Sequence, residues 1–464
     1  MFVKCLRSIL VMMILLVLLV ACGQAAPPAA PVEEPAAEAP AAEATEQPAE
    51  EAVAEQPEEA IEPGTLRVWM TWGDNPAQVQ ELFNKYTKAA GVKVEVNAPV
   101  DESKVIAALS GSEPPDILVL GSPDNVSAWV NEGLILPLDD MIAANKIDTA
   151  DIYPAMLAQG ERQGKLYSLP WGTDTYGLYW NKDLFEEAGL DPEKPPQTLE
   201  EMAEYADKLT KTDDNGEITQ LGFVPDFSWS HIEQYAAMFG GYWVNEDGTK
   251  IQLSSPAMVD ALKWEQQFYT KYDPEKVLKF TSSFGEYSSA EHGFMAGKVA
   301  MMVDGEWMTG PNFIQGLKPD LWYGVAPLPY PKDRPEQAGV NVVGGTMVVV
   351  PSGIKDQAAA GKLLAWMMSP EIIAEEMVAN FNLPSSKKSA EDPRFRENES
   401  FAVFLDTAAG ANTKHQIYTP ASTEIFTEIE LIEEQVLHAG ADPEPLLKEA
   451  EAKLQPALDK ALAK

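Results

Sequence analysis

Apolar and polar residues follow two periods along this chain, and the elements they predict alternate after residue 64. Residues 65–70 (Thr-Leu-Arg-Val-Trp-Met) form a short apolar run typical of a strand. Asn75-Pro76 then opens a predicted helix with apolar residues at i, i+3, i+4 and i+7, and Gly91 ends it. A strand, a helix and a strand follow at residues 92–96, 102–109 and 117–120. This alternation predicts a parallel sheet in an α/β layer.

Two of these strands end in residues suited to ligand binding. Trp72 and Asp74 follow the first strand, and Gly121 and Ser122 follow the third. In open α/β sheets, ligands bind beyond the carboxyl ends of the strands. There an indole can stack on an apolar ring face while a carboxylate accepts hydrogen bonds. A core position for Trp72 and a helix-capping role for Asp74 are the open alternatives.

Two further helices are predicted from local signals. Ser122 or Asp124 is expected to cap the helix that carries Trp129 and ends near Gly133. An amphipathic run at residues 446–462 predicts a helix near the C-terminus.

The first residues predict export. Lys4 and Arg7 precede an apolar run at residues 8–20, which is too short for a typical membrane span. The run ends in Leu-Val-Ala-Cys-Gly, which resembles a bacterial lipobox, so cleavage before Cys22 and its acylation are expected. Residues 1–21 are therefore interpreted as a lipoprotein signal peptide. An ordinary signal peptide with a chance cysteine is the alternative.

Residues 22–63 are interpreted as acylated Cys22 followed by a disordered tether. Between residues 24 and 63, 33 of 40 residues are Ala, Pro or Glu, and none is basic or aromatic. Such a segment buries too little apolar surface to offset its ordering entropy. Its reach would lie between about 35 Å as a coil and about 120 Å as polyproline II.

Charge and composition narrow the range of partners. The chain has 34 basic and 72 acidic residues and a formal net charge of -38, which opposes binding to nucleic acid or to anionic membrane surfaces. Its 464 residues, 45% of them apolar, predict two or three domains with real cores. Both cysteines, Cys5 and Cys22, lie at the N-terminus, so no disulfide framework is expected in the folded part.

Histidine positions give no metal or catalytic pattern. The four histidines are far apart and lack zinc-binding spacing: His231, His292, His415 and His438. Glu291-His292 is expected at a solvated helix start. We therefore predict no catalytic residue, no metal site and no cofactor. A secreted glycoside hydrolase is the enzyme alternative, although 72 acids make some carboxylate pair easy to find.

An acidic segment from Asp213 has the start of a calcium loop but not its end. The twelfth position of such a loop requires a bidentate Glu, and here it is Val224. Asn215-Gly216 is better interpreted as a turn before a strand at residues 219–224, and Asp247-Gly248 as another turn.

A longer motif carries a specific resemblance. Residues 178–191 read Leu-Tyr-Trp-Asn-Lys-Asp-Leu-Phe-Glu-Glu-Ala-Gly-Leu-Asp, and a predicted helix through Leu209 follows. This segment resembles the signature of family 1 extracellular solute-binding proteins, the sugar-binding subunits of ABC importers typified by maltose-binding protein. Other matching pieces recur in family order at residues 115–118, 133–138, 294–302, 305–307, 344–345, 369–371 and 383–385.

The resemblance implies an α/β, two-lobed, periplasmic-binding-protein-like fold, with a ligand cleft between lobes joined by hinge crossovers. Lobe one is expected at residues 64–173 plus 345–388, and lobe two at 174–344 plus 389–464. The C-terminal helices would pack on lobe two. The expected crossings are near residues 173–177, 343–345 and 388–393.

Site residues also follow from the resemblance. Carried over position by position, the ligand-binding residues are Trp72, Asp74, Gly121, Ser122, Asp174, Tyr176, Phe227, Trp229, Trp307, Gly344 and Gly345, with Phe426 aligning loosely. Aromatic rings would stack on the apolar faces of a sugar, and carboxylates would accept bonds from its hydroxyls. A turn cap for Asp174 and a buried core position for Trp307 are the alternatives.

The resemblance implies a receptor that catalyses nothing. It would be a monomer, lipid-anchored outside the cytoplasm in the periplasm or at the cell surface. Hinge closure would capture a neutral sugar, a disaccharide or short oligosaccharide, for delivery to an ABC permease. No basic residue falls among the mapped positions, which argues against phosphorylated or acidic ligands. The departure from the maltose-binding relative after the first strand argues against maltose itself. A polyamine, an amino acid or a peptide is the alternative ligand.

Overall fold

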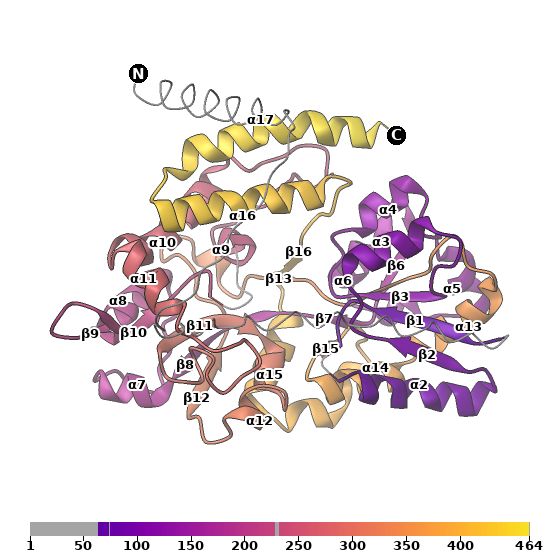
Figure 1. The fold of residues 1–464 in the computed structure, drawn as a ribbon, viewed down its shortest axis with the longest axis horizontal. Helices are drawn as coiled ribbons and strands as arrows, with labels where there is room; N and C mark the ends of the chain where they lie inside the picture. Colours follow the sequence, from indigo (N-terminus) through magenta and orange to yellow (C-terminus); the bar gives the residue numbers. More distant parts are fainter. Residues whose placement is uncertain (1–63, 74, 228–231, 464) are drawn as a thin grey trace, which may run out of the picture. The chain divides into compact units, whose positions relative to one another are not determined.

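The computed structural model describes residues 64–73, 75–227 and 232–463 (Figure 1). All of these residues belong to one compact unit. The predicted signal peptide, Cys22 and the tether therefore lie outside the described residues. Within the described residues, no helix is long and apolar enough to cross a membrane.

The first sheet contains five strands in the order β2-β1-β3-β14-β6. Its strands are β1 Leu66–Met70, β2 Val94–Asn97, β3 Ile117–Leu120, β6 Ser168–Pro170 and β14 Met347–Val349. The three strands predicted from the sequence pair in parallel, as expected. The strands β14 and β6 join them in antiparallel pairs, so the sheet is mixed.

The helix after β1, α2 (Pro76–Ala90), follows its local signals closely. The Asn75 side chain accepts a hydrogen bond from the backbone N–H of Gln78 at 3.3 Å, which caps the helix. Gly91 ends it in the left-handed conformation with φ of 69°. Its buried face is the predicted one, namely Val79, Leu82, Phe83 and Tyr86.

The predicted cap of α4 (Val126–Glu132) is wrong. Asn125 occupies the capping position and makes no side-chain capping bond. Ser122 Oγ instead accepts from the backbone N–H of Asp124 at 3.2 Å, and Asp124 lies two residues before the helix begins. Ser122 and Asp124 thus form a local turn instead of a helix cap. The predicted end of the helix at Gly133 is confirmed.

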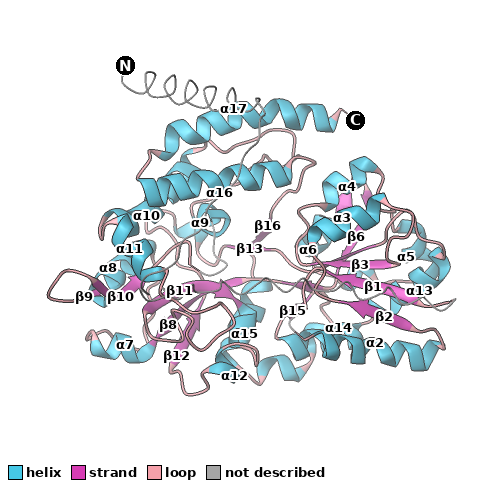
Figure 2. Ribbon diagram, viewed as in Figure 1, coloured by secondary structure: helices cyan, strands magenta, loops and turns pink. Residues whose placement is uncertain are grey.

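Helices flank the first sheet (Figure 2). Its core joins β1 and β3 to α2 and α13 through buried residues such as Val68, Phe83, Ile117 and Leu364. The remaining helices of this region are α3 Glu102–Ser110, α5 Asp139–Asn145, α6 Pro154–Leu157, α13 Gln357–Met367 and α14 Pro370–Asn380.

The second sheet has the order β12-β8-β11-β10-β9. Its strands are β8 Tyr176–Asn181, β9 Lys211–Thr212, β10 Ile218–Phe223, β11 Val299–Gly305 and β12 Tyr323–Ala326. Only the β10–β11 pair is parallel. The predicted turn at Asn215-Gly216 is confirmed, because it joins the antiparallel strands β9 and β10.

The C-terminal helices pack on the region of the second sheet. The predicted amphipathic helix is α17 (Pro443–Leu462), and it contacts α16 and α10. Ile429, Leu447, Leu454 and Leu458 are buried in the same core as Leu221 of β10. The helices here are α7 Lys182–Glu187, α8 Leu199–Leu209, α9 Ile232–Met238, α10 Pro256–Thr270, α11 Pro274–Thr281, α12 Ile314–Leu317, α15 Glu399–Ala408 and α16 Ser422–Ala439.

Short extended segments lead from one sheet to the other. The strand β7 (Gly172–Thr173) precedes β8, and β13 (Asn341–Val343) precedes β14. Asp174 and Gly344 form an antiparallel bridge between these two segments. Each segment has a second partner: β15 (Leu383–Pro384) pairs with β7, and β16 (Thr413–His415) pairs in parallel with β13. The other short elements are β4 Glu161–Arg162, β5 Lys165–Leu166 and the 3-10 turns η1 Thr149–Asp151, η2 Ala158–Gly160, η3 Glu306–Thr309, η4 Pro335–Gln337, η5 Ser389–Glu391 and η6 Pro393–Arg396.

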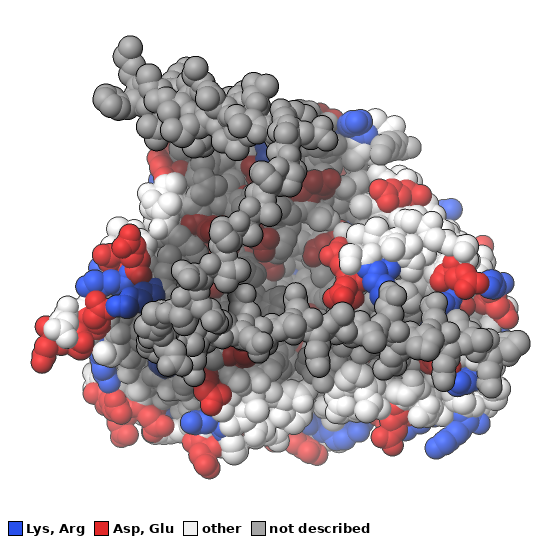
Figure 3. Space-filling view, viewed as in Figure 1, with Lys and Arg blue, Asp and Glu red and all other residues white. Residues whose placement is uncertain are grey.

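Charged side chains of both signs are interspersed on the described surface (Figure 3). Most of the ion pairs involve exposed groups, such as Lys279 with Glu217 and Lys355 with Glu113. Exposed pairs of this kind contribute little to stability. The fold therefore rests on its apolar cores.

Candidate ligand-binding cleft

A cavity of about 620 Å³ lies where the crossing segments meet the ends of the two sheets. Nine of the residues proposed from the sequence line it, coming from strand ends of both sheets, from the crossings and, for the last, from a C-terminal helix: Trp72, Gly121, Ser122, Asp174, Tyr176, Trp307, Gly344, Gly345 and the loosely aligned Phe426. Residues more than 350 positions apart are thus brought together.

Three proposed residues are not seen on the wall. Asp74 and Trp229 lie outside the described residues. Phe227 is described but does not line the cavity. Its ring stacks on His292 with centroids 4.7 Å apart and meets Phe284 edge to face at 5.3 Å, so it packs behind the wall.

The expectation for His292 is wrong. His292 is buried between Phe227 and Tyr287, and the residues around it form turns rather than a helix. Burial lowers the pKa of His292 to about 4, so the imidazole is neutral at pH 7. Among the described residues, no group of three or more His, Cys, Asp or Glu side chains is arranged to hold a metal ion.

One side of the cavity is an aromatic wall, which comprises Tyr176, Tyr287 and Trp307. Trp307 Nε1 donates to the Tyr287 hydroxyl at 2.5 Å, and that hydroxyl donates to the Asp304 carboxylate at 3.1 Å. Asp304 is fully buried and also accepts from the backbone N–H of Gly305 at 2.7 Å. Tyr176 meets Trp307 edge to face at 5.9 Å. This chain of bonds fixes the indole plane without a ligand.

A pair of carboxyl groups lies at the first crossing. Glu306 is fully buried and accepts from the backbone N–H of Thr175 at 3.0 Å and of Leu383 at 3.3 Å, which ties this crossing to β15. Burial raises the pKa of Glu306 well above its usual value, and nearby Asp174 adds to the shift. Burial also raises the pKa of Asp174 to about 7, against a weak bond from Asn382 at 3.5 Å. Hydroxyl donors from a ligand would favour the ionised form of Asp174.

Two uncharged amide side chains line another part of the cavity. They belong to Gln234 of α9 and to Gln416, which directly follows β16. We call these two residues the amide wall. Both line the cavity and both are buried. Neither amide atom of Gln416 has a hydrogen-bond partner, and Gln234 Oε1 has none either. Gln234 Nε2 makes only a long contact of 3.5 Å to Glu233.

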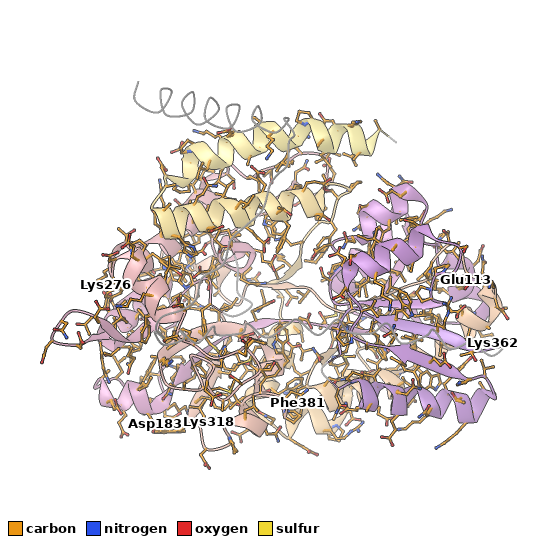
Figure 4. All side chains as sticks on the ribbon, viewed as in Figure 1. Glu113, Asp183, Lys276, Lys318, Lys362 and Phe381 are labelled. Carbon is orange, nitrogen blue, oxygen red and sulfur yellow. The ribbon has the colours of Figure 1, made fainter. Side chains whose placement is uncertain are left out.

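Two asparagines reach the cavity from the end of α14. Phe381, labelled in Figure 4, ends this helix with a left-handed φ of 54°. The turn places Asn380 and Asn382 on either side of it, and both line the cavity. Asn380 Nδ2 donates to Glu376 at 2.8 Å, and burial raises the pKa of Glu376 to about 7.

The two adjacent glycines on the wall differ in their backbones. Gly345 has φ of 135°, and a Cβ there would lie 2.6 Å from Thr173 Cα and 2.7 Å from the Gly172 carbonyl oxygen. Only glycine fits this close approach of the two crossing segments. A Cβ on Gly344 would meet nothing within 4 Å.

The charge of the wall has one sign among the residues that the structure describes. Asp124, Asp174, Glu233 and Glu430 line the cavity, and no Lys or Arg does. Arg162 acts electrostatically on the wall residue Tyr418 but does not line the cavity.

Sequence reasoning missed part of the wall. The missed polar and aromatic residues are Asp124, Glu233, Gln234, Tyr287, Ser288, Phe313, Thr346, Asn380, Asn382, Gln416, Tyr418 and Glu430. Asp124 was detectable, because it lies two residues beyond Ser122 at a strand end. No local signal marks Gln416 or Asn382, since only the pairing of β16 with β13 and of β15 with β7 brings them to the cavity.

Comparison with known proteins gives one family. Residues 72–374 match the family described as bacterial extracellular solute-binding protein. This range includes the second sheet, the first sheet apart from β1, and the crossing strands β7 and β13.

Individual relatives have low sequence identity to this chain but match it over long segments. The maltotriose-binding protein of Pyrococcus abyssi is 23% identical over 367 residues, covering 78% of this chain and 74% of that protein. The sn-glycerol-3-phosphate-binding periplasmic protein UgpB of Brucella abortus is 27% identical over 304 residues, covering 62% of this chain and 66% of that protein. Among solved structures, CpMnBP1 with mannobiose bound superposes with a TM-score of 0.75 at 28% identity, covering 84% of this chain and 99% of that one.

Proposed function

The chain belongs to the bacterial extracellular solute-binding proteins, and from this premise we propose that it captures a neutral disaccharide or short oligosaccharide for an ABC importer. One observation carries the proposal. The cavity combines aromatic rings and hydrogen-bonding side chains in about 620 Å³, a volume typical of small-molecule sites. A sugar has apolar C–H faces and a rim of hydroxyls, so this lining matches both features.

The charge of the wall supports a neutral ligand. Four carboxyl groups face the cavity, and among the described wall residues no Lys or Arg balances them. A phosphate or carboxylate on the ligand would be repelled and would lack the cationic partner that such groups require. Although UgpB relatives bind sn-glycerol-3-phosphate, this lining argues against a phosphorylated ligand for this chain.

Capture by hinge closure is part of the proposal. Ligand contacts would come from strand ends of both sheets, at Trp72 and Ser122 on one side and at Trp307 on the other. A ligand that touches both sides favours the closed arrangement because only there are all its contacts made. The lobes are proposed to be residues 64–173 plus 345–388 and residues 174–344 plus 389–464.

Location and partners are proposed from the N-terminal sequence. Cys22 in its Leu-Val-Ala-Cys-Gly context would carry the lipid anchor, and residues 24–63 would tether a monomeric receptor beside its permease. The family and the relatives named above are binding proteins, and we propose that this chain likewise has no enzymatic activity.

A ligand screen tests this function. The chain without residues 1–21, carrying Cys22→Ser, would be heated with mannobiose, maltotriose, other neutral oligosaccharides, amino acids and spermidine. A ligand that binds only the native state raises Tm by mass action. We expect a neutral oligosaccharide to raise Tm, with calorimetry giving its Kd and chromatography finding it intact. A hit confined to spermidine or amino acids, or sugar cleavage, would reject the proposal.

A further inference from the structure

Two buried N–H donors on the cavity wall have no acceptor within the part of the chain that the structure describes. Gln416 is 3% exposed, and both its Nε2 and its Oε1 lack a partner. Trp72 Nε1 is also buried without a partner. Most buried polar atoms in proteins are hydrogen-bonded, because leaving them unpaired costs free energy. Because Gln416 and Trp72 both line the cavity, their unpaired donors indicate acceptor atoms on the occupant.

The carboxylates on the wall cannot replace these N–H donors. Ionised Asp and Glu side chains accept hydrogen bonds and donate none. Asp124, Asp174, Glu233 and Glu430 are of this type when they are ionised, and the described wall has no Lys or Arg. An occupant that only donates, such as a polyamine, would satisfy the carboxylates but leave Gln416 Nε2 and Trp72 Nε1 unpaired.

The two donors enter the cavity from different parts of the fold. Trp72 follows β1 of the first sheet. Gln416 directly follows β16, which pairs with β13, and the next two residues after β13 are the wall glycines Gly344 and Gly345. A bond to Gln416 would thus be made beside a crossing segment, while a bond to Trp72 would be made at the rim of the first sheet.

We propose that Gln416, together with Trp72 Nε1, binds acceptor oxygens of the ligand and selects a polyhydroxylated sugar against donor-only cations. The proposal rests on the proposed function and deepens it by assigning these two residues. Each sugar hydroxyl donates and accepts, so one ring can pair with the carboxylates and with these N–H groups together. Gln416 is a specificity-determining residue in this assignment.

Substitution of the amide separates this role from mere packing. Gln416→Glu keeps the shape and the acceptors but removes the donor. We expect it to weaken binding of mannobiose or maltotriose at pH 8 about tenfold or more in calorimetry, which is about 1.4 kcal/mol. Gln416→Asn shortens the side chain and serves as the second variant. Sugar affinity within threefold of wild type in both variants would overturn the assignment.

The chain provides a matched control. Gln159 is 1% exposed, and both its amide atoms lack partners, yet it does not line the cavity. Gln159→Glu should leave sugar affinity within twofold, whatever it does to Tm. An equal loss of affinity at Gln159 and Gln416 would show a general folding effect and would also overturn the assignment.

A ligand series on the unaltered protein keeps the test decisive if the variants fold poorly. Deoxy sugars lack both functions of one hydroxyl, whereas deoxyfluoro sugars keep a weak acceptor there. At the sugar hydroxyl that accepts a hydrogen bond from Gln416 or Trp72, the deoxyfluoro analogue should bind severalfold tighter than the deoxy analogue. Equal losses at every position would reject donation by the protein while leaving sugar binding itself intact. Binding of spermidine but of no sugar would instead reject the proposed function.

Discussion

The aromatic wall and the amide wall differ in where their hydrogen bonds go. In the aromatic wall, Trp307 and Tyr287 are joined to Asp304 by bonds within the protein. In the amide wall, Gln416 is as buried as a core residue yet has no partner for either amide atom. One wall is thus positioned by the protein in advance, and the other has bonds left to make.

This difference separates two contributions to recognition. A ring held rigid by its neighbours loses little conformational entropy when a ligand stacks on it, so it contributes affinity for any sugar face. An unpaired amide contributes only when the ligand presents matching atoms, so it contributes selectivity. The predictions below test the first wall against the second.

Removal of the stacking ring should have the largest effect. Trp307→Ala deletes the indole and the donor to Tyr287, and we expect sugar affinity to fall about 100-fold, or about 2.7 kcal/mol. Titration calorimetry with mannobiose or maltotriose measures this. Trp307→Phe keeps a ring and should retain part of the affinity. A loss below threefold in the alanine variant would mean that the ring does not stack on the ligand.

The paired glycines between the walls should separate stability from binding. Gly345→Ala places a Cβ 2.6 Å from Thr173 Cα at a strained φ, so unfolding should become easier by about 2 kcal/mol. Gly344→Ala has open space around its Cβ and should change stability by less than about 0.5 kcal/mol. Urea unfolding of both variants measures the contrast. Equal destabilisation would contradict the close approach of the two crossings.

Loosening the aromatic wall without removing its stacking ring should have a smaller effect. Tyr287→Phe breaks the link between Trp307 and Asp304 while keeping the aromatic packing. We expect about a fivefold to tenfold loss of affinity, because Trp307 Nε1 loses its acceptor. His292 packs against Tyr287, so near-ultraviolet circular dichroism should confirm intact packing. Unchanged affinity would show that the indole is held by packing alone.

A pH comparison tests the residues behind Asn380. Burial raises the pKa of Glu376 from 4.5 to about 7, so the folded state holds more protons than the unfolded state between these values. The stability contributed by this group is therefore lost as pH rises from about 4.5 to about 7. Glu376→Gln removes the effect, so the variant should gain about 1 kcal/mol relative to wild type between pH 5 and pH 6.

Thermal unfolding across that pH range measures this difference. Glu375→Gln is the neighbouring comparison: its half-buried carboxylate pairs with Lys85 and adds to the raised pKa of Glu376, so this variant should reduce the pH effect only in part. A constant difference between Glu376→Gln and wild type at all pH values would show that Glu376 titrates normally.

Much of the local structure was predictable. Asn75 and Gly91 delimit α2 because a side-chain cap and a left-handed glycine act within one helical turn. The first three strands pair as expected, and the 446–462 run lies within α17, because their apolar periods match one buried face each. The family motif added the two-lobed expectation and cavity residues such as Asp174, Tyr176 and Trp307.

Predictions failed where two local interactions compete or where distant burial decides. Ser122 and Asp124 are good capping residues, but they bond to each other's segment in a turn before α4 begins. His292 is polar and follows an acid, yet Phe227 and Tyr287 cover it. Neither the turn before α4 nor the burial of His292 could be predicted from the neighbouring residues in the sequence.

The sequence by itself determined α2, α3 and α17, the first three strands of the first sheet, the family and some of the rings expected around a ligand, because each depends on short-range periodicity or on a contiguous motif. Only the tertiary structure decided the antiparallel places of β14 and β6, the bonding of Trp307 to Tyr287 and Asp304, and the arrival of Gln416 at the cavity. These features depend on pairings between segments that lie tens to hundreds of residues apart, as β16 with β13 shows. Such pairings follow from the packing of the whole chain rather than from any local preference.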